Sequence, residues 1–112
     1  MQNRNLIVIG NNLPSDFSDE KYLTKYYFSK INYNEKSIYF DLSIDSLIEN
    51  QDIFKNYFDI VINVDDWEYV KTVLRLAKPL SRIFLAQEFT DSTIDIDFYN
   101  TIHSKNLLIK FI

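Results

Sequence analysis

The stretch "LIVIGNNLPSDFSDE", residues 6–20, decides the fold that we expect for this chain of 112 residues. Its four leading apolar residues predict a strand that is buried on both faces, as is typical of a central strand in a parallel sheet. Gly10 and a polar turn through Pro14 follow the strand, and serines and acidic residues then suit the start of a helix near Asp16. The stretch therefore predicts a strand–turn–helix unit.

The same alternation continues to the end of the sequence. Short apolar runs are typical of buried strands, and apolar residues that recur every third or fourth position between them predict helices. We expect strands over Asn5–Gly10, Ser37–Leu42, Phe58–Val64, Arg82–Ala86 and Leu107–Ile112. We expect helices over about 16–31, from Ser43 through Tyr57, from Asp65 or Asp66 to the residues before Pro79, and over about 95–104.

Strict alternation of strands and helices predicts an α/β fold with right-handed crossovers. We expect one three-layer α/β/α domain over residues 1–112, with a mainly parallel five-stranded sheet. The expected strand order is 2-1-3-4-5, as in flavodoxin-like folds. The fifth strand has no helix after it, and Lys110 lies in the middle of one of its faces. We expect that face to meet solvent or a partner.

Composition excludes several classes of function. Sixteen acidic residues face twelve scattered basic ones, which gives a net charge of −4, so this small acidic protein is not expected to contact nucleic acid directly. The chain has no cysteine, which excludes disulfides and thiolate chemistry. Its apolar runs are too short for a membrane span or a signal peptide. We therefore expect a cytoplasmic protein without membrane contact.

The turn after the first strand occupies the place of a phosphate-binding loop. Such a loop needs several glycines, but Gly10 is the only glycine in the chain, and Pro14 removes an amide donor. A phosphate loop also needs a lysine followed by serine or threonine, which is absent here. We therefore expect no nucleotide cofactor, and the remaining residues show no catalytic constellation.

Asp65 and Asp66 follow the third predicted strand and allow two interpretations. Paired carboxylates can bind Mg²⁺, but aspartate is also a preferred residue at the start of a helix, and we favour the cap. The placement resembles the phosphoacceptor aspartate of response-regulator receiver domains. Those domains also carry an acidic pair after strand 1, where this chain has Asn11 and Asn12. A degenerate receiver-like switch, or a small metal-dependent enzyme that uses the two aspartates, remains an alternative.

Aromatic residues are concentrated in and after the first predicted helix. Four aromatics within the seven residues 22–28 cannot share one face of a helix with 3.6 residues per turn. Some of them then face outward, where tyrosine favours protein interfaces, unless the helix has a wide buried face. We therefore expect a non-catalytic protein–protein interaction or assembly domain that binds a partner protein or a second copy. Its candidate interaction residues are Tyr22, Tyr26, Tyr27, Phe28, Tyr33 and Lys110.

Three stretches resemble the psi subunit of the bacterial DNA polymerase III clamp-loader assembly. They are "LIVIGNNLP" (Leu6–Pro14), "YLTKYYFSKI" (Tyr22–Ile31) and "IYFDLSIDSLIE" (Ile38–Glu49), less than half of the chain. We expect two departures from that family, since residues 1–112 show neither its extended N-terminal segment nor, in the C-terminal half, its helix rich in leucine and tryptophan. The resemblance implies a non-enzymatic bridging subunit with partners in the replisome, and it carries over no functional residues.

Overall fold

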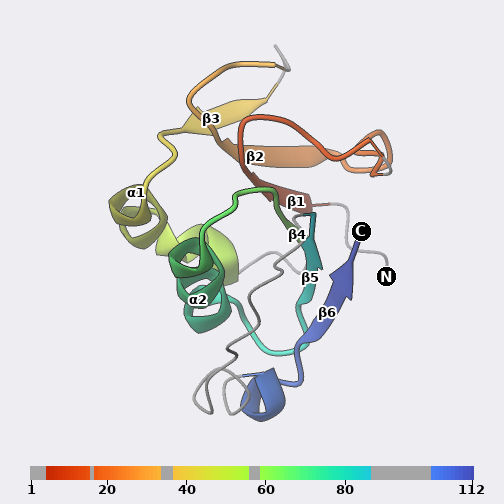
Figure 1. Ribbon diagram of the computed structural model, residues 1–112, viewed down its shortest axis with the longest axis vertical. Helices are drawn as coiled ribbons and strands as arrows, with labels where there is room; N and C mark the ends of the chain where they lie inside the picture. Colours follow the sequence, from red (N-terminus) through yellow and green to blue (C-terminus); the bar gives the residue numbers. More distant parts are fainter. Residues whose placement is uncertain (1–4, 16, 34–36, 56–58, 87–101) are drawn as a thin grey trace.

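The computed structural model describes residues 5–15, 17–33, 37–55, 59–86 and 102–112. These residues form an α/β fold around one parallel sheet in the order β3-β2-β1-β4-β5-β6 (Figure 1). The α/β class and the parallel sheet are therefore confirmed, with six strands in place of the predicted five. The strands are β1 (Asn5–Ile9), β2 (Thr24–Phe28), β3 (Ile38–Phe40), β4 (Asp59–Ile62), β5 (Arg82–Leu85) and β6 (Leu108–Phe111).

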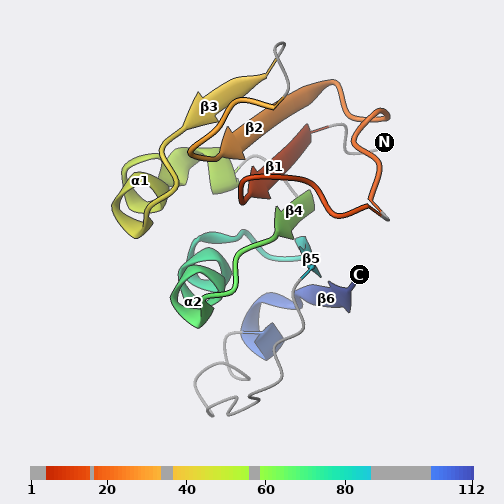
Figure 2. The same ribbon diagram turned by 45° about the horizontal axis from the view of Figure 1, so that its top comes forward.

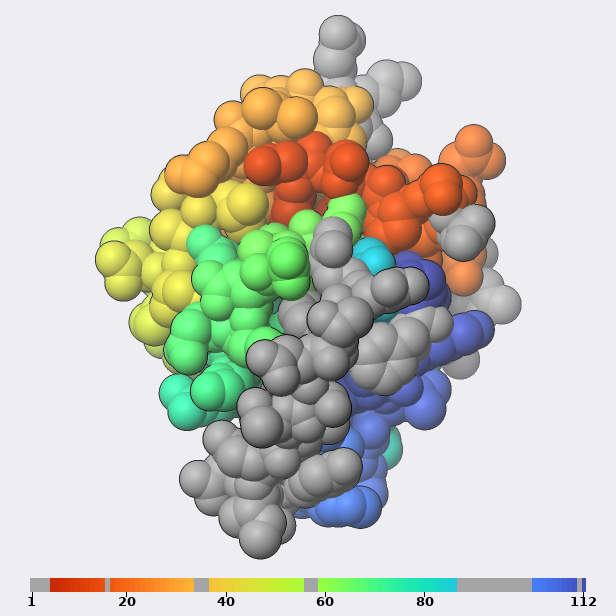
Figure 3. All heavy atoms as spheres, viewed as in Figure 1, coloured from red at the N-terminus to blue at the C-terminus, as the bar shows by residue number. Residues whose placement is uncertain are grey.

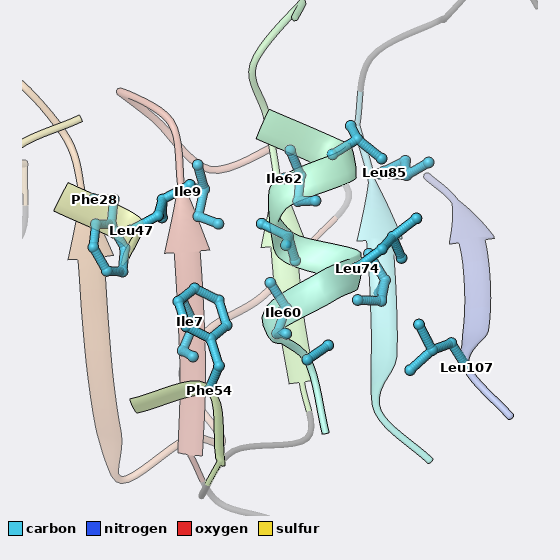
Figure 4. Close-up of a cluster of buried hydrophobic side chains, with 14 of the residues drawn as sticks. Ile7, Ile9, Phe28, Leu47, Phe54, Ile60, Ile62, Leu74, Leu85 and Leu107 are labelled. Carbon is cyan, nitrogen blue, oxygen red and sulfur yellow. The ribbon is translucent and has the colours of Figure 1, made fainter. Parts of the chain in front are cut away.

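Helices cover one face of this sheet. They are α1 (Ile44–Glu49), the 3₁₀ helix η1 (Gln51–Lys55) and α2 (Trp67–Leu76), and all lie on the same side of the strands (Figure 2). Beneath them, alternate residues of β1, β4 and β5 form a row of buried aliphatic side chains, with Leu74 of α2 above (Figure 4). We call this cluster the helix-side core. Its fully buried members include Ile7, Ile9, Phe28, Leu47, Phe54, Ile60, Ile62, Val70, Val73 and Ile83.

Side chains fix both ends of these helices. Ser43 caps α1, and its Oγ accepts a hydrogen bond from the Ser46 amide at 3.1 Å. Asp66 caps α2, and its Oδ1 accepts from the Glu68 amide at 2.9 Å. At the other end of α2, the Lys105 ammonium donates to the carbonyls of Leu74, Arg75 and Ala77. Unpaired carbonyls at a helix C-terminus favour such a cation.

The opposite face of the sheet has no helix in the described ranges. The loop between β1 and β2 lies across it instead, on the other side of the strands from α1 and α2 (Figures 1 and 2). The predicted three-layer α/β/α arrangement is therefore wrong for this face, because a loop takes the place of the expected helical layer. Leu6, Val8, Tyr22, Tyr27 and Val61 form a second cluster under the loop, with Leu13, Phe17, Tyr33, Tyr39, Phe84 and Ile112 packed against it. We call it the loop-side core.

The helix predicted over residues 16–31 is the largest error of the sequence interpretation. Residues 24–28 form strand β2, which lies between β1 and β3 and pairs with both in parallel register. The strand places Tyr27 in the loop-side core and Phe28 in the helix-side core. Aromatics that cannot share one helix face thus lie on the two faces of a strand. Burial on both faces overrides the four-residue spacing that indicated a helix.

The extra strand also changes the sheet order. The five predicted strands keep their expected relative order, but β2 separates the first from the second. The result, 3-2-1-4-5-6, is the order of doubly wound dinucleotide-binding folds, with a topological switch point between β1 and β4. Ligands of such sheets bind beyond the carboxyl ends of the strands at that point. The ends of β1 and β4 are therefore the first place to search for a site.

Residues 102–105 are helical and agree with the end of the helix predicted over 95–104, whose remaining residues lie outside the described ranges. No helix within the described ranges combines the length and the apolar character that crossing a bilayer requires.

Candidate functional site

The switch point is closed by direct contact between the two strand ends. The Asn63 amide donates to the Ile9 carbonyl at 2.7 Å, and Gly10 lies against the backbone of Asn63. Gly10 has φ of +140°, and a Cβ at this position would lie 2.5 Å from the Asn63 carbonyl oxygen. Glycine is required here because only it allows this backbone angle and this close approach. The glycine of the opening turn therefore brings two strands together.

Asparagine side chains complete the closure. Asn63 Nδ2 donates to the Asn12 backbone carbonyl at 3.0 Å and to Asn12 Oδ1 at 2.6 Å. Asn11 Oδ1 accepts from the Lys30 amide at 2.8 Å and from the Ser29 hydroxyl at 3.2 Å. Asn11 and Asn12, which stand where receiver domains carry an acidic pair, thus tie the turn to the residues that follow β2 and β4.

The two aspartates after β4 have different positions. Asp66 caps α2, as predicted, whereas Asp65 is exposed in the turn before it. Among the described residues, no three histidine, aspartate or glutamate side chains gather where a metal ion could be held. The geometry of Asp66 supports the structural interpretation of this residue.

The predicted interaction residues are mostly internal. Tyr22, Tyr27 and Phe28 are buried, and Tyr26 and Tyr33 are half-buried, so this group offers little exposed aromatic surface. The expectation of an outward-facing aromatic helix was wrong because the segment is a strand with two covered faces. Lys110 differs from the rest, since its side chain is exposed.

Three tyrosines pack together in the loop-side core. The ring of Tyr27 stacks on Tyr39 at 5.1 Å between centroids, and Tyr33 meets Tyr27 edge-on at 4.9 Å. The Tyr27 hydroxyl donates to Asp19 Oδ2 at 2.6 Å, which ties the β1–β2 loop to β2. Burial raises the pKa of the Tyr33 hydroxyl above its ordinary value. This cluster is a packed core in which the rings contact one another.

A buried carboxylate lies deeper under the same loop. Asp59, at the start of β4, is fully buried and accepts from Arg82 Nε at 2.7 Å and from Arg82 Nη2 at 2.5 Å. The Tyr22 hydroxyl donates to Asp59 Oδ2 at 2.6 Å. Burial and the bond to Asp59 raise the pKa of Tyr22, and the same carboxylate raises the pKa of Arg82. Because Tyr22 belongs to the loop while Asp59 and Arg82 belong to adjacent strands, this network anchors the loop to the sheet.

This network was not predicted from the sequence, although the sequence does indicate the pair of Asp59 and Arg82. An aspartate inside the apolar run "FDIVINV" and an arginine that opens the next predicted strand fall on neighbouring strands. Two opposite charges at the same end of adjacent strands predict a pair. No sequence pattern predicts the hydrogen bond from Tyr22 to Asp59, because that bond depends on the path of the β1–β2 loop.

Strand β6 forms one edge of the sheet, and its side chains include an exposed apolar surface. The Leu108 side chain is 59% exposed, and Lys110 is exposed two residues later on the same side of the strand. In Figure 3 the blue atoms of residues 102–112 lie at the molecular surface. Leu80 is 64% exposed and directly precedes Ser81, whose backbone carbonyl accepts a hydrogen bond from the Leu108 amide at 3.0 Å. Other large apolar side chains are exposed elsewhere in the described ranges, namely Leu23, Ile31, Ile38 and Ile48.

Comparison of the chain with protein-family models, curated proteins and solved structures finds no match.

Proposed function

We propose that this chain is a non-catalytic protein-binding domain whose contact surface is centred on β6. One observation carries the proposal: Leu108 is 59% exposed on an edge strand, directly beside the exposed Lys110. Burial of an exposed leucine against a partner removes apolar surface from water, which favours association. A neighbouring cation adds orientation and selectivity to such a contact.

The rest of the described surface supports the same proposal. At the end of the sheet where ligands of related topologies bind, Asn63 donates hydrogen bonds to Asn12 across the two turns. The buried carboxylate of Asp59 accepts hydrogen bonds from Arg82 and Tyr22 within the chain. Leu23, Ile31, Ile38 and Ile48 are also exposed in the described ranges. Leu108 differs from them because its edge strand also presents an exposed lysine, Lys110, on the same face.

Site-specific photo-crosslinking in cells that naturally express the chain tests the proposal. A benzophenone amino acid at position 108 is expected to capture one discrete protein, which mass spectrometry then identifies. The matched control places the same group at Glu49, which is exposed on α1 at the other side of the molecule. Equal capture from both positions, or none from position 108, would contradict the proposal.

Membership of the bacterial replicase, which the resemblance to the psi subunit implies, stays a prediction. The segment Tyr22–Ile31 that contributed to the resemblance contains β2 and not the expected helix. The crosslinking experiment bears on it directly: capture of a clamp-loader subunit from position 108 would support the replication role, and capture of another protein would oppose it.

A further inference from the structure

The hydrogen bonds of β6 reveal which of its backbone groups face outward. The Leu108 amide donates to the Ser81 carbonyl at 3.0 Å, and the Ile112 amide donates to the Leu85 carbonyl at 2.9 Å. In a parallel ladder, alternate residues bond to the same neighbouring strand. Leu108, Lys110 and Ile112 therefore bond toward β5, and the backbone N–H and C=O groups of residues 109 and 111 point to the open side.

Within the described ranges, no strand pairs with that open side. A row of unpaired donors and acceptors is a template for an added strand, and protein domains bind extended peptides in this way. We infer that β6 binds an extended segment of a partner protein by strand addition, and that this segment places an acidic side chain beside Lys110 and an apolar one beside Leu108. This inference rests on the proposed function and specifies its partner.

The charge of Lys110 and the register of an added strand favour a partner segment with an acidic side chain. A strand that pairs with residue 109 places its neighbouring side chains next to Leu108 and Lys110, on the face of the sheet away from the helices. Opposite charges across a strand pair are favourable, and like charges are unfavourable. Among the described residues Lys110 has no ion-pair partner of its own, so an acidic side chain would meet an available cation. A second copy aligned at Lys110 would bring two ammonium groups together.

A pair of synthetic peptides tests the inference on the full chain. The acidic probe is acetyl-Thr-Val-Thr-Glu-Thr-Val-Thr-amide, whose symmetric pattern presents glutamate and valine on one face in either strand direction. The basic control replaces its glutamate with lysine. Amide NMR titration is expected to show shifts at residues 109 and 111, with the acidic probe bound about three- to ten-fold more tightly. Lys110→Glu is expected to reverse this preference.

Backbone variants separate strand addition from other contacts. Ile109→Pro removes one outward N–H and is expected to abolish binding of both peptides. Ile109→Ala, which loses packing but keeps the amide, is the matched control and is expected to bind the acidic probe. Shifts without a charge preference, or no shifts at residues 109 and 111, would overturn the inference. A third outcome would also overturn the inference: the unmodified chain binds neither peptide, and a Lys110→Ser variant dimerises in sedimentation experiments. The role of Lys110 would then be to prevent two copies from pairing through β6.

The crosslinking experiment distinguishes failure of this inference from failure of the proposed function. If position 108 captures a partner equally well with Ile109→Pro and with Ile109→Ala, the binding surface stands and strand addition fails. If position 108 captures nothing in the unmodified background, the proposed function itself fails.

Discussion

The two faces of the sheet are covered by different kinds of structure. On the helix side, α1, η1 and α2 satisfy their own backbone hydrogen bonds and contribute apolar side chains to a large core. On the loop side, the β1–β2 segment has no such internal ladder, and the core beneath it is smaller and richer in tyrosine. The loop is tied down by side-chain hydrogen bonds instead, from Tyr22 to Asp59, from Tyr27 to Asp19 and between Asn12 and Asn63.

The β1–β2 connection shows how a loop can replace the helix of a parallel crossover. A covering loop must satisfy its polar groups and still hold its position, since unpaired buried groups are costly. Here specific polar anchors replace the apolar stripe of a helix. We therefore expect the loop side to be sensitive to loss of single polar groups, and the helix side to be sensitive to loss of apolar volume.

The largest effect is expected where the two halves of the sheet join. Gly10→Ala forces a Cβ to within 2.5 Å of the Asn63 carbonyl at a φ of +140°, so strain and overpacking add. We expect a loss of about 3–6 kcal/mol in the free energy of unfolding. Urea denaturation measures it, with Ser15→Ala in the exposed part of the same loop as the control. A loss below 1 kcal/mol would show that the strand ends can separate without cost.

The next prediction breaks the polar anchor of the loop side. Among the described residues, Arg82→Ala leaves the fully buried Asp59 carboxylate with the Tyr22 hydroxyl as its one side-chain donor, and we expect a loss of about 3–5 kcal/mol. Asp59→Ala should cost less, because the side chain of Arg82 is 46% exposed and its guanidinium can turn to solvent. Equal losses for the two variants, by urea denaturation, would contradict an anchor built around the buried carboxylate.

Truncation of apolar side chains compares the two faces directly. Leu74→Ala removes a buried side chain from α2 over the helix-side core, and we expect a loss of about 2–5 kcal/mol. Phe17→Ala removes a half-buried ring from the loop, where it meets Phe84, and about 1–2 kcal/mol is expected. The same denaturation experiment measures both. A greater loss for Phe17→Ala would invert the proposed contrast.

The helix side was also the easier side to predict from sequence. Apolar runs gave β1, β4 and β5, and a cap at Asp66 with Pro79 beyond the helix gave α2. Each of these patterns lies within one short segment, so it can be recognised from the sequence alone. The loop side depends on pairing between distant segments: β2 has aromatic residues at helical spacing, and only its place between β1 and β3 makes it a strand.

The features of the candidate site likewise fall into those that local sequence predicted and those that depend on the path of the β1–β2 loop. The scarcity of glycines did not reveal that Gly10 allows close contact with Asn63, whereas Lys110 is exposed as expected. Leu108 shares a face of the last strand with Lys110 and is exposed with it, as expected. Ile112 lies on the same face but packs against the loop-side core, and the alternation of the strand did not predict this. The path of that loop, which Tyr22 and Asp59 fix together, decides how far the cover extends toward β6.

The smallest effect concerns alkaline pH and sharpens the contrast between the two faces. Burial raises the pKa of Tyr22 and of Tyr33, both in the loop-side core, above the value of about 10 for unfolded tyrosine. Above pH 10 the unfolded chain therefore loses these protons first and binds fewer than the folded chain. The free energy of unfolding then falls as pH rises, by up to about 1.4 kcal/mol per pH unit for each tyrosine.

Tyr33→Phe isolates this effect, because the buried Tyr33 hydroxyl has no hydrogen-bond partner among the described residues. At pH 8 we expect its stability to stay within about 0.5 kcal/mol of the unmodified chain, since no bond is lost. Between pH 10 and 11 the variant should lose less stability than the unmodified chain, as urea midpoints at each pH will show. Parallel pH profiles for the two proteins would mean that the loop already opens before Tyr33 ionises, and that its anchors hold more weakly than the packed helices opposite.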